Sequence, residues 1–406
     1  PDEARRILFD QRKAITGPTA LAGLPTSETE ATPEIQALAR ALRNDPKLIF
    51  DYVHNHVDYS PIFGSVNGAT AAVLAGRGND CDQTSLFIAL MRAAGYTTNY
   101  VVGDVTYDVA RLANWVGVDI SPTLVANVFA NGGIPVTVTF TPPSTYRIQL
   151  TRVWAQAVVS STTYTFDPAM KEYQDITGVS NLGAIIGYNQ TTFMTHALAG
   201  ATTTVSYTQN LNEPNVRADL ITYTMNLVNY LRTNLPDDSV DQVIGGRQIA
   251  QTEMTAYATS LPYALSVTNQ TTYTTIPTAY RHTLRVQHMG IDRTFNTFEI
   301  AGQRVSVFYR AGDNAPVLRV DGTPVFTGTA TTLGNRYPMT VTVDHPYAAF
   351  GGHYTDEHTF TMDSGAAYII AHDFNGVSSD LIAKRNGFLT QYLHDGQAGD
   401  SEPVRG

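Results

Sequence analysis

The stretch "GRGNDCDQTSLFIALMRAAG", residues 76–95, decides the fold because it predicts a helix that is buried on all sides. Asn and Asp stand just before an apolar run, a pattern typical of a helix N-terminus, and Gly95 is a typical stop. Such a helix belongs at the centre of a domain. The stretch also holds Cys81, the only cysteine in the chain, and therefore raises the question of whether Cys81 is a nucleophile.

Helical patterns precede this stretch and strand patterns follow it. Residues 32–57 predict two helices that are separated at Asp45-Pro46, and residues 66–78 predict a short Ala-rich helix. A long amphipathic helix is expected over roughly 210–235. Strands are predicted at 98–105, 134–141, 148–159 and 163–168, and strands with turns from about residue 262 onward, including a hairpin at Asp321-Gly322.

The order of these patterns predicts an α+β protein of several parts. We divide the 406 residues into an N-terminal arm or linker, an α+β domain, a helical connector, a β-rich C-terminal domain that resembles a sandwich, and a tail. The boundaries that we predict are 1–31, 32–200, 201–261, 262–390 and 391–406.

Composition and charge exclude several classes of partner. The net charge is −10 and no basic block offsets it, which argues against nucleic acid or an anionic membrane surface. No apolar run is long enough for a membrane span, and a single cysteine excludes an internal disulfide. His54 and His56 lack a third ligand nearby, so we expect neither a metal nor a cofactor. Scarce lysine favours a secreted or surface protein, and the start at Pro1 suggests a processed segment.

Residues 48–170 resemble the transglutaminase-like superfamily, whose core is papain-like. The family pattern runs from "G-x-C-x-D-x-A" through "L-x-R-x-x-G" and "H-x-W-x-E" to "D-P". This chain has "GNDCDQTSLFIALMRAAGYTTNYVVG", "TRVWAQAVV" and "YTFDPAMKEY" in the same order. The resemblance implies a helix packed on an antiparallel sheet in the domain at 32–200.

A looser resemblance covers more of the chain. Residues 30–385 look like the transglutaminase-like segments that lie beside Rhs-type repeats in large bacterial surface proteins. This resemblance implies that the chain is part of a larger Rhs-type polypeptide. It also implies an extracellular, periplasmic or cell-surface location.

The register of the resemblance moves the nucleophile position away from the cysteine. With Arg92 on the family's arginine, Gly78 matches the family glycine, and the nucleophile position then falls on Asp80. Cys81 lies one residue further along, about 100° around the helix. The resemblance therefore implies that Cys81 is not the nucleophile of this chain.

The other catalytic positions of the family change as well. Arg152 stands where the family has histidine, Asp167 is kept, and Asp82 matches the acidic residue two places after the nucleophile. Arginine stays protonated and cannot serve as the base that a thiol nucleophile requires. What remains is carboxylates beside a fixed cation, and paired carboxylates are the working parts of glycoside cleavage.

These residues predict an enzyme that cleaves an extracellular polysaccharide, specifically a β-glucan hydrolase (glucanase) using Asp80, Asp82, Arg152 and Asp167. Tyr59, Trp115 and Trp154 are predicted to bind the sugar, because aromatic faces stack well on pyranose rings; core packing is the alternative for both tryptophans. Three other functions stay open: a cysteine peptidase or acyl transferase using Cys81, a uronate-directed lyase, and a non-catalytic glycan- or protein-binding module.

Each acidic or basic candidate also has a purely structural interpretation. Asp80 with Gln83 fits a capping box at the start of the helix. Asp82 fits a residue that bonds the backbone in the first turn, and Arg152 with Asp167 fits a structural pair across two strands. The arrangement of these side chains in three dimensions decides between the interpretations.

Overall fold

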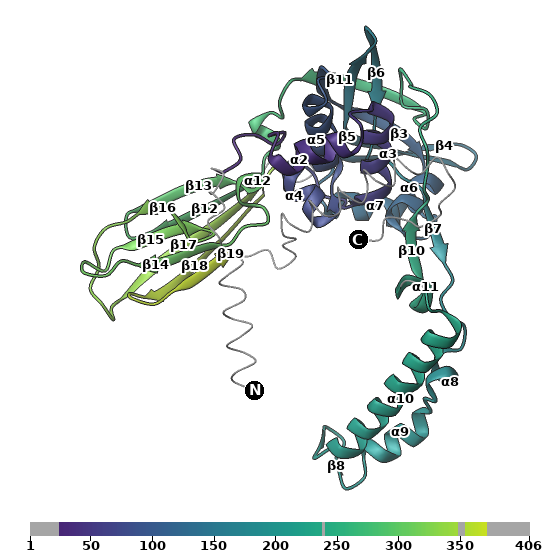
Figure 1. Ribbon diagram of the computed structural model, residues 1–406, viewed down its shortest axis with the longest axis vertical. Helices are drawn as coiled ribbons and strands as arrows, with labels where there is room; N and C mark the ends of the chain where they lie inside the picture. The colour runs from purple at the N-terminus through teal and green to yellow at the C-terminus, as the bar shows by residue number, and fades with distance from the viewer. Residues whose placement is uncertain (1–23, 238–239, 348–353, 372–406) are drawn as a thin grey trace. The chain divides into compact units, whose positions relative to one another are not determined.

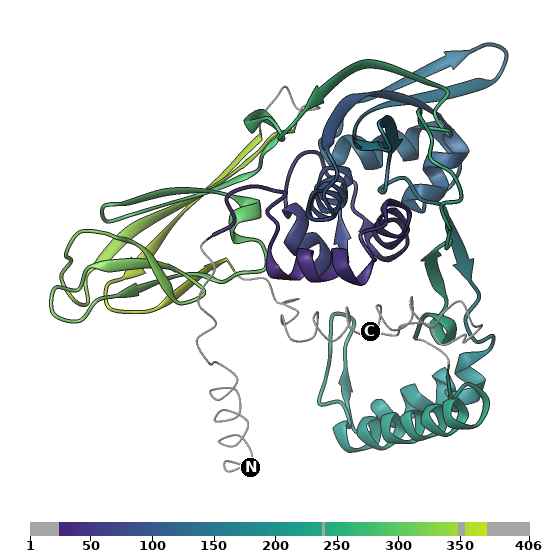
Figure 2. The ribbon, with the colours of Figure 1, turned by 45° about the horizontal axis from the view of Figure 1, so that its top comes forward.

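The computed structural model of the protein describes residues 24–237, 240–347 and 354–371. The predicted tail at 391–406 and most of the predicted N-terminal arm or linker at 1–31 lie outside these residues. The chain divides into two compact units, one formed by 1–172 together with 251–406 and the other by 173–250. Figures 1 and 2 show that both units mix helices with antiparallel strands, which confirms the predicted α+β class.

Four helices open the described part of the larger unit, and the first two begin at capping residues. Thr32 caps α2 by accepting a hydrogen bond from the backbone of Ile35, and Asp45 caps α3 in the same way. Proline occupies the first helical position of both. The bounds are Pro33–Ala41 for α2, Pro46–His56 for α3, Gly68–Ala75 for α4 and Asp80–Ala93 for α5.

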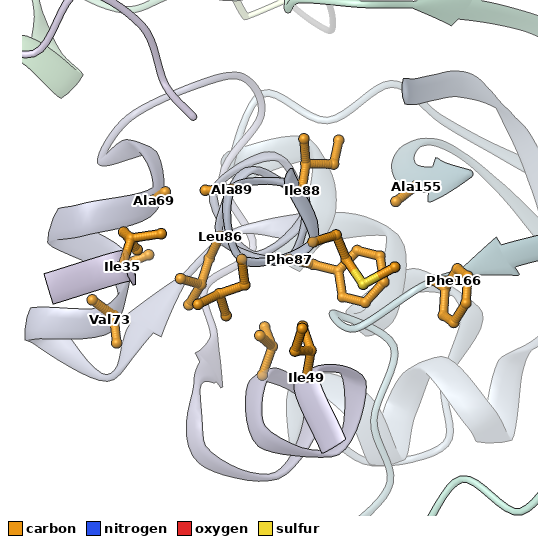
Figure 3. Close-up of a cluster of buried hydrophobic side chains, with 14 of the residues drawn as sticks. Ile35, Ile49, Ala69, Val73, Leu86, Phe87, Ile88, Ala89, Ala155 and Phe166 are labelled. Carbon is orange, nitrogen blue, oxygen red and sulfur yellow. The ribbon is translucent and has the colours of Figure 1, made fainter. Parts of the chain in front are cut away.

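Helix α5 is the centre of the core, as residues 76–95 predict. Every residue from Asp80 to Met91 is buried. Figure 3 shows why: Ile35 and Val73 lie on one side of the helix, Ile49 below it, and Phe166 on the far side. A helix surrounded in this way needs apolar residues all round and cannot be amphipathic.

An antiparallel sheet covers the remaining side of α5. Its strand order is β11-β3-β5-β4, and β6 pairs with the second half of β5. Strand β5 is long enough to pair with three strands and contacts α5 directly. The bounds are Thr98–Asp108 for β3, Val136–Thr141 for β4, Thr145–Val159 for β5, Thr162–Phe166 for β6 and Ser266–Tyr273 for β11; helices α6 (Val109–Val116) and α7 (Pro122–Asn131) follow β3, and β1 (Asp58–Tyr59) pairs with β2 (Arg77–Gly78).

The C-terminal part of the larger unit is a sandwich of two four-stranded antiparallel sheets, as predicted. Asp321 and Gly322 have positive φ angles of 46° and 83°, as the predicted two-residue hairpin requires. A short helix, α12, interrupts the expected run of strands. The sheets have the orders β13-β12-β17-β18 and β16-β15-β14-β19, and the bounds are Thr283–His288 (β12), Ile291–Asn296 (β13), Thr297–Ile300 (α12), Val305–Tyr309 (β14), Pro316–Val320 (β15), Thr323–Thr327 (β16), Arg336–His345 (β17), Tyr354–Asp363 (β18) and Tyr368–Ala371 (β19).

The smaller unit is a helical arm that two strands close. The long predicted helix is present as α10, and the predicted boundary at residue 200 lies within this unit. None of the described helices combines the length and hydropathy that a membrane crossing needs. The bounds are Tyr173–Ile176 (β7), Leu182–Ile186 (α8), Gln190–Ala197 (α9), Thr202–Thr203 (β8), Thr208–Gln209 (β9), Glu213–Asn234 (α10), Val240–Ile244 (α11) and Gly246–Ile249 (β10), and β10 pairs with β7.

Candidate active site

The N-terminus of α5 is capped by Asn79. The side chain of Asn79 accepts a hydrogen bond from the backbone N–H of Asp82 at 2.8 Å. The predicted capping by Asp80 is therefore wrong, because Asp80 is already the first helical residue. Gln83 completes no capping box either: its amide donates to the carbonyl oxygens of Asp58 and Gly78.

The carboxylate of Asp80 points across to strand β5. Its Oδ2 atom accepts hydrogen bonds from the backbone N–H of Val153 and from Nε of Arg152, both at 3.0 Å. Its Oδ1 atom accepts from the N–H of Cys81. The start of the central helix and the middle of the sheet are therefore joined through one buried side chain.

Arg152 holds two carboxylates at once. Its side chain is 0% exposed, and its Nη2 atom lies 3.0 Å from Asp167 while Nε lies 3.0 Å from Asp80. Nη1 donates to the hydroxyl of Tyr107 at 2.5 Å. The three positions that the resemblance assigns to the family's triad thus meet in one ion cluster, Asp80–Arg152–Asp167.

Asp167 is fixed by its own loop as well as by Arg152. Its Oδ1 atom accepts from the backbone N–H groups of Ala169 and Met170. The hydroxyl of Tyr263 donates to its Oδ2 atom. Every oxygen of this carboxylate has a donor, which is what a buried charge requires.

Aromatic side chains cover the ion cluster. The ring of Trp115 lies 4.4 Å from the guanidinium of Arg152, and Tyr59 stacks on Trp115 at 3.9 Å between ring centroids. Trp115 is 2% exposed and Trp154 is 1% exposed. Neither predicted sugar-binding tryptophan presents a free face to solvent, and both pack as core residues.

The electrostatics of the cluster keep its arginine charged. Burial raises the pKa of the Asp80 carboxyl above its ordinary value, and the charge and hydrogen bonds of Arg152 act against that rise. Burial opposes the charge of Arg152, yet Asp167, Tyr107 and Asp80 raise its pKa well above the ordinary value. The guanidinium is therefore a permanent cation that donates protons to hydrogen bonds and accepts none.

Asp82 lies apart from this cluster. Its Oδ1 atom accepts from the backbone N–H groups of Val66, Asn67 and Gly68 at 2.8–3.1 Å. Burial raises the pKa of Asp82 to about 6. A Cβ atom on Gly78 would lie 2.8 Å from the Cβ of Asp82, which explains the glycine at that position. The structure thus places Asp82 as the anchor of the loop before α4.

Cys81 is enclosed in the hydrophobic core. It is 0% exposed, and burial together with the charges of Asp82 and Asp80 raises the pKa of its thiol well above the ordinary value. The thiol lies within hydrogen-bond reach of Ser85, whose hydroxyl also donates to the Cys81 carbonyl. A protonated, inaccessible thiol is a poor nucleophile.

We expect the folded protein to resist alkylation at Cys81. Iodoacetamide should label it only as fast as the protein unfolds, because both access and the thiolate are missing in the native state. Mass spectrometry after timed labelling, with and without urea, measures this. A Thr139→Cys variant supplies an exposed control thiol on β4. Labelling of Cys81 in the native protein at the rate of that control would favour the alternative of a cysteine peptidase or acyl transferase.

Two tyrosines of the site escape sequence analysis. Tyr107 stacks on Tyr263 with ring centroids 5.9 Å apart, and each bonds one member of the ion cluster. The only sequence signal for Tyr107 is the alternation of side chains along β3. Tyr263 lies 96 residues beyond Asp167, so no local pattern connects them.

A shallow hollow lies on the surface around Arg111. It is lined by α6 and the residues around it: Asp108, Val109, Ala110, Arg111, Asn114 and Glu172. Arg111 pairs with Glu172 at 2.7 Å, and its guanidinium lies 5.9 Å from the Tyr263 ring. Within residues 24–237, 240–347 and 354–371, no three His, Cys, Asp or Glu side chains gather to hold a metal ion.

The domain is an α+β core in which the N-terminus of the buried helix α5 packs against an antiparallel sheet. Asp80, Arg152 and Asp167 meet at that junction. The family model of the transglutaminase-like superfamily matches residues 30–168, a range that contains Asp80, Arg152 and Asp167. This part of the chain is a transglutaminase-like domain. Comparisons with curated proteins and with solved structures found no match.

Proposed function

We propose that the transglutaminase-like domain is a non-catalytic carbohydrate-binding module. The observation that carries this proposal is the ion cluster: Arg152 stands at the position of the family's base and is bound to both Asp80 and Asp167. Thiol acyl transfer needs an imidazole or an equivalent proton acceptor beside an accessible thiol. This site offers neither.

The same cluster argues against carboxylate catalysis in this conformation. A glycosidase pair must reach the glycosidic bond, with one carboxyl protonated and the other ionised. Both Asp80 and Asp167 are buried, and each spends its oxygens on Arg152 and on backbone N–H groups. Their geometry is that of a structural network, which supports the binding function over cleavage.

The hollow beside α6 has the chemistry that a hydroxyl-rich ligand needs. Asp108, Arg111, Asn114 and Glu172 supply donors and acceptors at its wall, and Tyr263 supplies an aromatic neighbour. Sugars are bound in proteins by such hydrogen-bonding side chains together with aromatic rings. We therefore place the proposed oligosaccharide site here.

Glycosidic cleavage, including β-glucan hydrolysis or a uronate-directed lyase reaction, is the second candidate. Tyr263 favours it, because its hydroxyl donates to Asp167 and its ring lies beneath the guanidinium of Arg111, which lines the hollow. Displacing Tyr263 would bring Asp167 to the wall of the hollow. In that case Asp167 and Asp80 would be the chemical groups.

A polysaccharide panel separates the two candidates. We expect binding without turnover, measured by affinity electrophoresis and by assays of reducing ends and unsaturated products. Arg111→Ala should weaken binding by roughly ten- to a hundredfold, since a hydrogen bond from a charged group contributes roughly 1.5–3 kcal/mol and about 1.4 kcal/mol is tenfold. Arg336→Ala is the matched control, because Arg336 also forms a 2.7 Å ion pair at the surface. Reducing ends or unsaturated products would establish the second candidate.

We also propose that the protein works outside the cytoplasm, at the cell surface or in the periplasm, as part of a larger Rhs-type polypeptide. Scarce lysine supports this placement. Fractionation of the source cells, followed by immunoblotting against this chain, measures both the compartment and the length of the polypeptide that carries it.

A further inference from the structure

The helical arm, residues 173–250, has almost no core of its own. Among its described residues only Ala197, Val243 and Ile249 are buried. Burial of apolar surface is the main term that offsets the loss of chain entropy on folding. A unit that buries so little needs a further surface to pack against.

One face of α10 packs within the arm. Tyr223 of α10 joins Tyr188 and Phe193 in an aromatic cluster, with ring centroids about 6 Å apart. Asp219 binds His196 of α9, and the amide of Asn226 binds the carbonyl of Ile186 in α8. Figure 1 shows α8 and α9 along this one side of α10.

The opposite face of α10 carries an apolar stripe. Leu220, Ile221 and Met225 are 52%, 58% and 55% exposed. They belong to a shallow groove whose members recur at helical spacing: Glu213, Val216, Arg217, Leu220, Ile221, Thr224 and Met225. Val228 continues the same spacing. Large apolar side chains gathered along one exposed face mark a contact surface.

We propose that this α10 stripe is the interface between two copies of the chain, paired antiparallel about a two-fold axis. The charges at the two ends of the stripe favour a second copy of the chain as the partner. Glu213 stands at the N-terminal end of the stripe and Arg232 near the C-terminal end, both exposed. Antiparallel pairing centred between residues 222 and 223 sets Glu213 of each copy against Arg232 of the other.

The same register places apolar residues opposite one another. Leu220 meets Met225 of the second copy, and Ile221 meets Thr224, on either side of the axis. Parallel pairing would instead set Glu213 against Glu213, which is repulsive. A two-fold interface requires that one surface complement itself, and the α10 stripe does so only in the antiparallel sense.

Oligomeric state tests the proposal on the full chain. Sedimentation equilibrium should give a dimer, and Leu220→Glu with Ile221→Glu should weaken dimerisation at least a hundredfold. Thr202→Glu adds a like charge at an exposed residue of β8, in the same unit but off α10, and should leave the dimer unchanged. A monomeric parent chain, or a dimer that the double variant leaves intact, would overturn the proposal; the stripe would then take another segment or another partner.

Charge exchange tests the antiparallel register. Glu213→Arg alone and Arg232→Glu alone should each weaken the dimer, and the two together should restore it. An unfolded protein would not regain dimer affinity, so restored affinity in the double variant shows that the protein is folded. The test therefore holds even if the Leu220 and Ile221 variants unfold residues 173–250. Failure of the double exchange to restore affinity counts against the proposed register.

Disulfide trapping gives an independent measure of direction. Thr224→Cys lies near the proposed axis and should cross-link to itself in mild oxidant, whereas Glu213→Cys should not, because its two copies would lie about 28 Å apart along the helices. Cys81 is buried and does not compete. Self-cross-linking of Glu213→Cys would show parallel pairing and overturn the proposal.

Discussion

Replacing Arg152 by methionine should lower the free energy of unfolding by about 3–5 kcal/mol, the cost of leaving a buried charge without its partner. Methionine keeps much of the side-chain volume, so the loss reports the charge and its hydrogen bonds. Two carboxylates, Asp80 and Asp167, would remain in the core without the guanidinium that now pairs with both. Urea denaturation followed by circular dichroism measures the change.

Arg147 is the matched control for this experiment. It lies on the same strand and pairs with Asp108, but its side chain is 36% exposed. Exposed pairs contribute about 0–1 kcal/mol, so Arg147→Met should have a small effect. Equal losses for the two variants would mean that the buried cluster contributes no more than a surface pair.

Neutralising the whole cluster should recover much of the loss. In an Asp80→Asn, Asp167→Asn background, Arg152→Met no longer strands a charge, and its cost should fall to less than half. Both asparagines still offer an oxygen to the backbone donors Val153 and Ala169. An unchanged cost in that background would assign the effect to packing and would remove the electrostatic account of the cluster.

The central helix and its partners were accessible from sequence because local patterns specify them. The apolar run of residues 76–95 predicts burial on all sides, and α5 is buried from Asp80 to Met91. The spacing of the transglutaminase-like motifs brings Arg152 and Asp167 together, and the structure pairs them at 3.0 Å. The first prediction rests on a local pattern and the second on the spacing of motifs, since Arg152 and Asp167 are 15 residues apart.

The features that sequence analysis missed depend on individual side-chain contacts and not on the periodicity of the chain. Asn79 and Asp80 are both good capping residues, and only the helix start decides which one caps. The burial of Trp115 follows from the stacking of Tyr59 on its ring and from the guanidinium of Arg152. Neither contact leaves a trace in the periodicity of the chain.

The division into units was also beyond sequence. After the helical arm the chain returns to the transglutaminase-like domain, where the backbone N–H of Thr165 binds the carbonyl of Ala258 and β11 extends the sheet beside β3. Tyr263 reaches Asp167 on this return path. A domain assembled from two distant stretches has no boundary signal that a linear pattern reveals.

His282 should make the protein less stable as the pH falls below about 6.5. This imidazole is 3% exposed and joins the sandwich to the loop before α4: its Nε2 atom lies 2.7 Å from the carbonyl of Phe63, and its Nδ1 atom lies 2.9 Å from Nδ1 of His345. A carbonyl only accepts, so Nε2 carries the proton and Nδ1 accepts from His345. Burial lowers the pKa of His282 to about 4, with His345 adding to the fall and Phe63 and Asp344 opposing it.

The sign follows from proton binding. An unfolded histidine takes up its proton near pH 6.5, whereas folded His282 does so only near pH 4, so the unfolded state binds more protons between these values. The contribution of His282 is complete above pH 6.5 and decreases by about 3 kcal/mol as the pH falls through 4. Asp82 and Asp51 act in the opposite direction, since burial raises both pKa values to about 6 and their contributions are lost as the pH rises.

Because Asp51 and Asp82 oppose the effect of His282, the quantity to measure is the difference in stability between the parent and a His282 variant. The free energy of unfolding of the parent minus that of His282→Gln should decrease by about 3 kcal/mol from pH 7 to pH 4, because Asp51 and Asp82 cancel in the subtraction. NMR titration of the His282 ring should show its protonation in the same window. A difference that stays constant from pH 7 to pH 4 would mean that His282 takes up its proton at the same pH in the folded and the unfolded protein. The site would then accept the charged imidazole, and the lowered pKa of His282 would be refuted.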